Sequence, residues 1–94
     1  MSGVVILSTA RTALTKSARG AFKNTHGITL SSHALANAIE RAGVSPEEIE
    51  DVIMGCAYPE GATGFNIGRN ATMAAGCPPS TAGSTINRYC SSGL

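Results

Sequence analysis

Near the end of the 94-residue sequence, a cysteine stands among residue types that suit nucleophilic chemistry. Cys90 follows an alternating apolar and polar segment and precedes Ser91, Ser92 and Gly93, which are small enough to let a substrate approach the sulfur. This pattern predicts a thiol at the junction between a strand and a following helix. There, the positive end of the helix dipole would favour the thiolate, and free backbone amides would stabilise an oxyanion. A single cysteine is equally often a small buried hydrophobic residue, so both interpretations stay open at this point.

The other chemically versatile side chains are weaker candidates. We expect His26 in a loop and His33 on the solvated face of a helix, and we predict that neither is catalytic. Cys56 lies in an apolar run and Cys77 precedes two prolines, which favours a packing role for each. The cysteines and histidines lack metal-ligand spacing, so no zinc or other metal site is predicted. Arg88, on the predicted strand close to the candidate nucleophile, is predicted to be buried and paired.

Composition and charge exclude several function classes. The formal net charge is +1 and no basic run occurs, so nucleic acid is not a predicted partner. No apolar stretch approaches the roughly 20 residues that span a bilayer, and the first residues lack the features of a signal peptide. Together with three cysteines in no paired motif, this predicts a reducing, cytoplasmic location without membrane attachment. The glycines form no phosphate-binding loop, so a nucleotide cofactor is not predicted.

Three strands and two helices, predicted to alternate along the chain, would position Cys90. Nearly continuous apolar runs predict buried strands over residues 4–8 and 51–57, and an alternating run predicts a third strand over 81–88. Apolar residues at helical spacing predict helices over 29–42 and 65–75, and residues 9–27 are predicted to form a surface loop. The order strand, helix, strand, helix, strand predicts an α/β protein with parallel strands and helical crossovers.

Local signals set the expected ends of the helices. Thr29 is expected to cap the first helix, and Gly43 to end it in the left-handed conformation. The sequence Ser-Pro-Glu-Glu at residues 45–48 predicts a capping box that opens about one helical turn. Gly76, followed by two prolines, is expected to stop the second helix.

The run NRYCSSGL at residues 87–94 resembles the active-site signature of the thiolase family, in which that cysteine takes the acyl group. Further blocks resemble the family in the same order along the whole chain, at residues 4–12, 42–49, 52–56 and 66–71. One departure is Ala13, where many thiolases have proline, and it falls in a loop. The resemblance implies an α/β thiolase fold, of which residues 1–94 are the first part of the N-terminal β-α-β-α-β half, ending just after the nucleophilic Cys90.

The resemblance also implies an activity. Cys90 would form an acyl-cysteine intermediate while 3-ketoacyl-CoA is cleaved with CoA to acetyl-CoA and a shortened acyl-CoA, or in the reverse condensation. Coenzyme A and acyl-CoA would be substrates, and no bound cofactor is implied. The family's histidine base and its second, acid–base cysteine would lie in later segments, beyond residue 94.

As partners, the resemblance implies the remainder of a thiolase polypeptide and assembly into a homodimer or homotetramer, with a role in fatty acid β-oxidation. It also implies that the segment of Arg88 lies close to the dimer interface, which favours an interface or scaffold role for this residue. We expect this chain alone to be inactive and aggregation-prone, because the elements that would cover its sheet are absent. Two alternatives stay open. One is a related condensing enzyme of the hydroxymethylglutaryl-CoA synthase or ketoacyl synthase type, and the other is an inactive fragment or assembly module.

Overall fold

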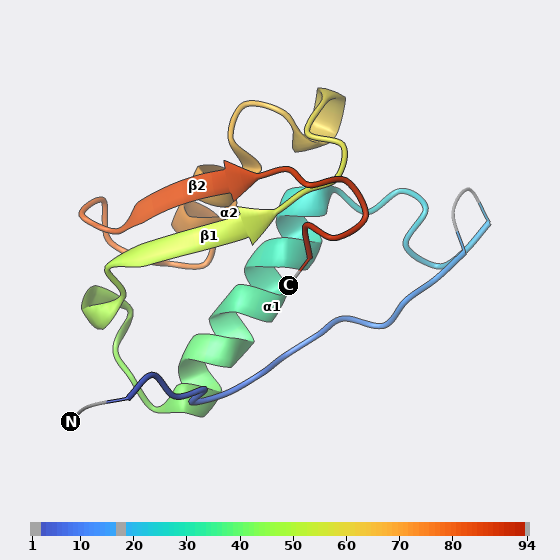
Figure 1. Cartoon of the computed structure of the whole chain (residues 1–94). Helices are drawn as coiled ribbons and strands as arrows, with labels where there is room; N and C mark the ends of the chain where they lie inside the picture. Colours follow the sequence, from blue (N-terminus) through green and yellow to red (C-terminus); the bar gives the residue numbers. More distant parts are fainter. Residues whose placement is uncertain (1–2, 17–18, 94) are drawn as a thin grey trace.

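Two helices and two parallel strands form the main regular structure of this computed structural model, which describes residues 3–16 and 19–93 (Figure 1). The α/β class is confirmed, and so is the helical crossover between parallel strands. Residues 17–18 of the predicted loop, and residues 1–2 and 94 of the predicted domain, lie outside the described residues. The elements, in chain order, are α1 (Gly27–Ala42), η1 (Pro46–Glu48), β1 (Asp51–Gly55), η2 (Gly61–Thr63), α2 (Ile67–Ala74) and β2 (Ala82–Ile86).

Strands β1 and β2 pair in parallel and in a single register. Asp51 lies opposite Ala82 at one end, and Gly55 lies opposite Ile86 at the other. A hydrogen bond of 3.0 Å from the Cys56 amide to the Ile86 carbonyl extends the ladder by one step. Because parallel strands end at the same edge of a sheet, the segment that follows β2 starts beside the end of β1.

Helix α2 approaches β2 so closely that backbone meets backbone. A Cβ atom at Gly68 of α2 would overlap the Ser84 carbonyl group of β2, and one at Gly83 would lie 2.7 Å from the Arg69 Cα atom. Neither position has room for a side chain, which explains why glycine occurs on both sides of this contact. Helix α2 therefore fixes β2 and the start of the segment that leads to Cys90.

The side chain of Asn66 joins the start of α2 to β2. Asn66 caps the helix by accepting a hydrogen bond from the Arg69 amide at 3.3 Å. Its side-chain amide donates to the Gly83 carbonyl at 3.1 Å, and its Oδ1 accepts from Thr85 Oγ1 at 2.7 Å. Thr85 Oγ1 in turn accepts from the Gly68 amide at 3.0 Å. Two amides at the start of α2 thus obtain acceptors that the helix itself does not provide.

The core lies on one face of the sheet, where α2 packs on both strands and α1 packs on α2. Both helices lie on this side in Figure 1. The opposite face is open, since Ile53 and Ile86 are 62% and 43% exposed there. The buried residues come from both helices, β1 and the segment before β2: Ile39, Val52, Ile67, Gly68, Ala71, Thr72, Cys77 and Thr81.

The strand predicted over residues 4–8 is wrong. These residues belong to no strand, and the side chains of Val4 and Leu7 are 103% and 66% exposed. A strand needs a hydrogen-bonded neighbour, and the sheet of the described residues contains only β1 and β2. The segment instead runs along α1, where Ser8 Oγ donates to the Ala38 carbonyl at 2.6 Å and Arg41 donates to the Thr9 carbonyl at 3.0 Å.

The helix ends differ from the predictions by one or two residues for identifiable reasons. Helix α1 begins before Thr29, because the imidazole of His26 accepts the Ile28 amide at 3.1 Å and caps the helix instead. Helix α2 begins after Phe65, because Phe65 and Asn66 have φ values of 54° and 57°. Gly43 adopts the predicted left-handed conformation, with a φ value of 72°, and Gly76, which was predicted to stop the second helix, has a φ value of 92°. The capping box at residues 45–48 is also confirmed.

Strands β1 and β2 are shorter than predicted. The first was expected to continue to Ala57 and the second to span residues 81–88, but they end at Gly55 and Ile86. Thr81, expected in the strand, lies just before it and is fully buried, and its Oγ1 donates to the Ile49 carbonyl at 2.8 Å. The two residues after Ile86 leave the sheet because the chain turns there.

Candidate active site

Cys90 lies in an exposed turn that follows β2 and crosses the end of β1 (Figure 1). Tyr89, directly before it, has a φ value of 51°, which is uncommon for an aromatic residue. The structure therefore contradicts the interpretation of Cys90 as a small buried hydrophobic residue. Residues 91–93 form turns, so the predicted junction with a helix is not present in the part of the chain that the structure describes.

Hydrogen bonds within the turn connect the residues before and after Cys90. The Arg88 amide donates to Ser92 Oγ at 2.6 Å, and Ser92 Oγ donates to the Tyr89 carbonyl at 2.7 Å. Ser91 Oγ donates to the Arg88 carbonyl at 2.9 Å, and the Tyr89 amide donates to Asn87 Oδ1 at 2.8 Å. These bonds give the exposed turn a defined conformation.

The turn rests on β1 at Gly55. A Cβ atom at this position would overlap the carbonyl group of Ser92, so only glycine allows the chain to pass there. A hollow of about 370 Å³ opens between the turn and the free face of the sheet. Its lining comes from β1, from β2 and from the turn around Cys90: Ile53, Gly55, Ile86, Arg88, Ser91, Ser92 and Gly93. A substrate group could lie in this hollow, directly beside the neighbours of Cys90.

Arg88 differs from its prediction. The residue is exposed and lies outside β2, because the strand ends at Ile86 and the chain turns. It lines the hollow beside Cys90, so the expected buried pairing is wrong for this structure. Its role at an interface remains a prediction.

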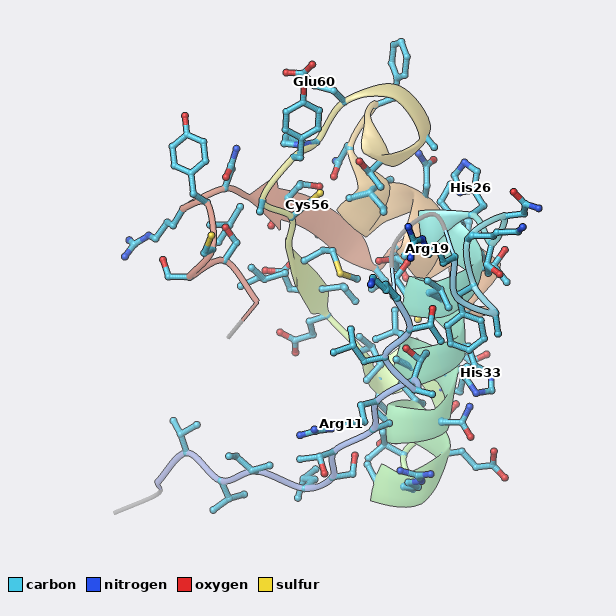
Figure 2. All side chains as sticks on the ribbon, turned by 90° about the vertical axis from the view of Figure 1, so that its right-hand side faces the viewer. Arg11, Arg19, His26, His33, Cys56 and Glu60 are labelled. Atoms are coloured by element: carbon cyan, nitrogen blue, oxygen red, sulfur yellow. The ribbon has the colours of Figure 1, made fainter. Side chains whose placement is uncertain are left out.

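The two histidines lie far from the turn that contains Cys90. His33 is exposed on α1, as predicted, and His26 caps the same helix rather than lying free in a loop. Figure 2 shows both on the side of the molecule opposite to the C-terminal turn. Neither is placed to take a proton from Cys90.

The other two cysteines occupy more protected positions. Cys77 is buried, and burial raises the pKa of its thiol, with a further rise from the charge of Glu47. Cys56 is half-buried directly after β1. A raised pKa keeps Cys77 in the unreactive thiol form, which fits its predicted packing role. Cys90 is thus the most accessible thiol of the three.

Residues 3–16 and 19–93 contain neither a membrane-spanning helix nor a cluster of metal ligands. No helix there is long and apolar enough to cross a membrane. No group of three or more histidine, cysteine, aspartate or glutamate side chains there is arranged to hold a metal ion.

The sequence did not reveal the contacts that place the turn. The closure of the turn by Ser92 had no signal beyond a small polar residue near the cysteine. The close approach at Gly55 had one, since a glycine within an apolar strand segment often marks a point where another backbone segment comes close.

Comparison with known proteins extends these observations. Residues 4–94 match the family described as "Thiolase, N-terminal domain". The 3-ketoacyl-CoA thiolases of Colwellia psychrerythraea and Aliivibrio salmonicida are 42% and 41% identical over 95 residues. These matches cover 100% of this chain but only 25% and 24% of those proteins, so the chain spans about a quarter of the length of its relatives. A crystal structure of Acat5 thiolase from Ascaris suum in complex with coenzyme A has a TM-score of 0.85 and 33% identity, over 93% of this chain and 22% of that one.

Proposed function

The chain belongs to the thiolase family, and from this membership we propose that Cys90 is the acyl-accepting nucleophile of an acyltransferase. The observation that supports this most directly is the exposed position of Cys90 beside the hollow at the end of β1 and β2. A thioester substrate must reach the sulfur atom, and a cysteine held in the core would not allow this. The small residues that follow Cys90 leave space for that approach.

The proposed reaction has two transfers. The Cys90 sulfur attacks the keto carbon of a 3-ketoacyl-CoA and forms a thioester, while the bond from that carbon to the adjacent α-carbon breaks. The α-carbon takes up a proton, which balances the one lost from the thiol, and leaves as the methyl group of acetyl-CoA. The thiol of free CoA then attacks the acyl-cysteine, which releases the shortened acyl-CoA and returns a proton to Cys90. Condensation is the same sequence in reverse.

The described residues supply the nucleophile but not the proton transfer. His26 and His33 lie away from the turn, so we propose that the acid and base groups belong to other parts of the polypeptide. This division agrees with the expectation that residues 1–94 alone are inactive. It also agrees with the share of the relatives' length that the chain spans.

The test is acetylation of the full-length protein. After brief exposure to acetyl-CoA, the intact mass should rise by one acetyl group, and peptide mapping should place it on Cys90. Cys90→Ala should gain none and lose thiolysis of 3-ketoacyl-CoA by at least about a thousandfold. Cys56→Ala, a matched control at a half-buried thiol, should behave like wild type. An acetyl group on another residue, or activity retained in Cys90→Ala, would contradict the proposal.

Further properties of the full-length protein belong to the same proposal. The names of the bacterial relatives support 3-ketoacyl-CoA as the substrate. We propose fatty acid β-oxidation as the process in which the full-length protein acts. The coenzyme A in the Ascaris suum structure supports CoA as the second substrate. We further propose a cytoplasmic homodimer or homotetramer. Light scattering on the full-length protein tests the assembly, and a monomeric mass would contradict it.

A further inference from the structure

In the turn that contains Cys90, the Ser92 side chain makes two hydrogen bonds, in addition to the bonds of Asn87 and Ser91 and the backbone bonds of the turn. Ser92 Oγ accepts the Arg88 amide at 2.6 Å and donates to the Tyr89 carbonyl at 2.7 Å, so one hydroxyl bonds the backbone on either side of Tyr89. The Tyr89 carbonyl belongs to the peptide that joins Tyr89 to Cys90, and Ser92 lies two residues after Cys90. The hydroxyl therefore links the chain entering Cys90 to the chain leaving it.

The conformation of the turn needs such a link. Tyr89 has a φ value of 51°, in the left-handed region, which is unfavourable for a residue with a Cβ atom. Without compensating bonds, the peptide before Cys90 would relax toward a common conformation. Because Tyr89 and Cys90 are consecutive, a change in ψ at Tyr89 would move the Cys90 sulfur.

Ser92 is itself held against the sheet. Its carbonyl group lies over Gly55, at a distance that excludes even a methyl group there. Gly55 is the last residue of β1 and pairs with Ile86, so it belongs to the most regular part of the structure. Ser92 thus connects the exposed turn to a fixed point on the sheet, and its side chain is half-buried there.

We propose that Ser92 is a positioning residue for Cys90, an inference that rests on the proposed role of Cys90 as acyl acceptor. Its hydroxyl bonds the Arg88 amide and the Tyr89 carbonyl and so holds the backbone on either side of Tyr89, and its own backbone anchors the turn at Gly55. A displacement of about 1 Å in a reacting group can lower a rate on the order of 100-fold. The loss of this one hydroxyl would therefore slow acyl transfer while the fold is retained.

The experiment compares three variants of the full-length protein. Ser92→Ala removes the hydroxyl, Ser92→Thr keeps it, and Ser80→Ala is a control at an exposed serine in the turn before β2. For each we would measure kcat and KM for thiolysis and the rate of Cys90 acetylation by acetyl-CoA. Ser92→Ala should lower kcat about 10- to 100-fold with KM within about twofold of wild type. Ser92→Thr should recover most of the loss, and Ser80→Ala should match wild type.

The outcomes separate a positioning role from a structural one. An unchanged kcat in Ser92→Ala, or a rise in KM alone, would overturn the proposal. Loss of amide protection in β1 and β2 of Ser92→Ala would also overturn it, because the hydroxyl would then be needed for folding rather than for placing Cys90.

Failure of the proposed function would be recognised separately. If wild-type protein is not acetylated at Cys90, the acyl-acceptor role fails, and alkylation of Cys90 by iodoacetamide then tests positioning alone. In that case, an alkylation rate changed severalfold by Ser92→Ala and restored by Ser92→Thr would support the fixed thiol. Equal rates in all three proteins would overturn it.

Discussion

Replacing Gly68 by alanine tests whether backbone contact holds α2 against β2. The new Cβ atom would overlap the Ser84 carbonyl oxygen, and it would lie 2.7 Å from the Ser84 carbonyl carbon and 3.2 Å from Met54 Cβ. Ser84 belongs to a paired strand, so its carbonyl group cannot rotate away without breaking the ladder. The helix would have to move outward from the sheet.

Two opposing effects determine the size of the change. Alanine is a better helix former than glycine by about 1 kcal/mol, which by itself would stabilise α2. Extra volume in a packed contact costs about 1–3 kcal/mol, and an obstacle made of backbone favours the upper end. The net result should be a loss of about 1–2 kcal/mol in the free energy of unfolding.

Hydrogen exchange of the full-length protein gives the local measurement. A loss of this size should speed exchange of the α2 amides about 5- to 30-fold. Gly27→Ala is the matched control, because Gly27 is also helical but its Cβ would meet only side-chain ends, Thr63 Cγ2 at 2.9 Å and Ile67 Cδ1 at 3.4 Å. Those groups can shift, so the control should be near neutral.

The opposite ordering of the two variants would refute the reasoning. If the α2 amides of Gly68→Ala exchange as slowly as those of the wild type, or more slowly, helix propensity outweighs packing. The close approach to Ser84 would then not constrain α2. If Gly27→Ala is as harmful as Gly68→Ala, the effect belongs to any new methyl group in a helix rather than to backbone contact.

Two further predictions concern the cap of α2 and the buried thiol. Asn66→Gly keeps the left-handed backbone accessible but removes the side-chain bonds of Asn66, including those with Gly83 and Thr85 of β2. Urea unfolding should then show a loss of about 1–2 kcal/mol in the free energy of unfolding. An unchanged urea midpoint would contradict this prediction. Under native conditions, Cys77 should react with iodoacetamide at least about tenfold more slowly than Cys90, because burial and Glu47 raise its pKa. In the unfolded chain the Cys77 thiol ionises near the unperturbed pKa of 9.0, whereas in the folded chain its pKa is higher. The free energy of unfolding should therefore fall as the pH rises from this unperturbed pKa to the pKa of the folded state. Equal alkylation rates for the two thiols would show that Cys77 is not protected.

The sequence was sufficient for the features that local patterns determine. Gly43 and Gly76 end their helices as predicted, and the crossover of α2 between parallel strands follows from the order of the segments. The start of α1 was missed because a histidine acts as its cap, a role more often filled by serine, threonine, asparagine or aspartate.

The failures have a common physical cause, since they depend on contacts between distant segments. The apolar residues 4–7 have the pattern of a buried strand, but a strand forms only where a neighbour offers hydrogen bonds. The burial predicted for Arg88 failed in the same way, because the length of β2 is set by its pairing with β1. For the site, the pattern around Cys90 identified the candidate residue, whereas the contacts of Ser92 and Gly55 could be seen only in the three-dimensional structure.

The parallel pairing of β1 and β2 also constrains the order of folding. Residues 56–81 separate the two strands, so their pairing cannot begin as a local hairpin and must bring distant segments together. Helix α2 lies within this connection and contacts both strands, and the Gly68 and Asn66 contacts define where β2 can lie. We therefore expect α2 to dock on β1 before β2 joins. The turn around Cys90 would then form last, only after the edge on which it rests is complete.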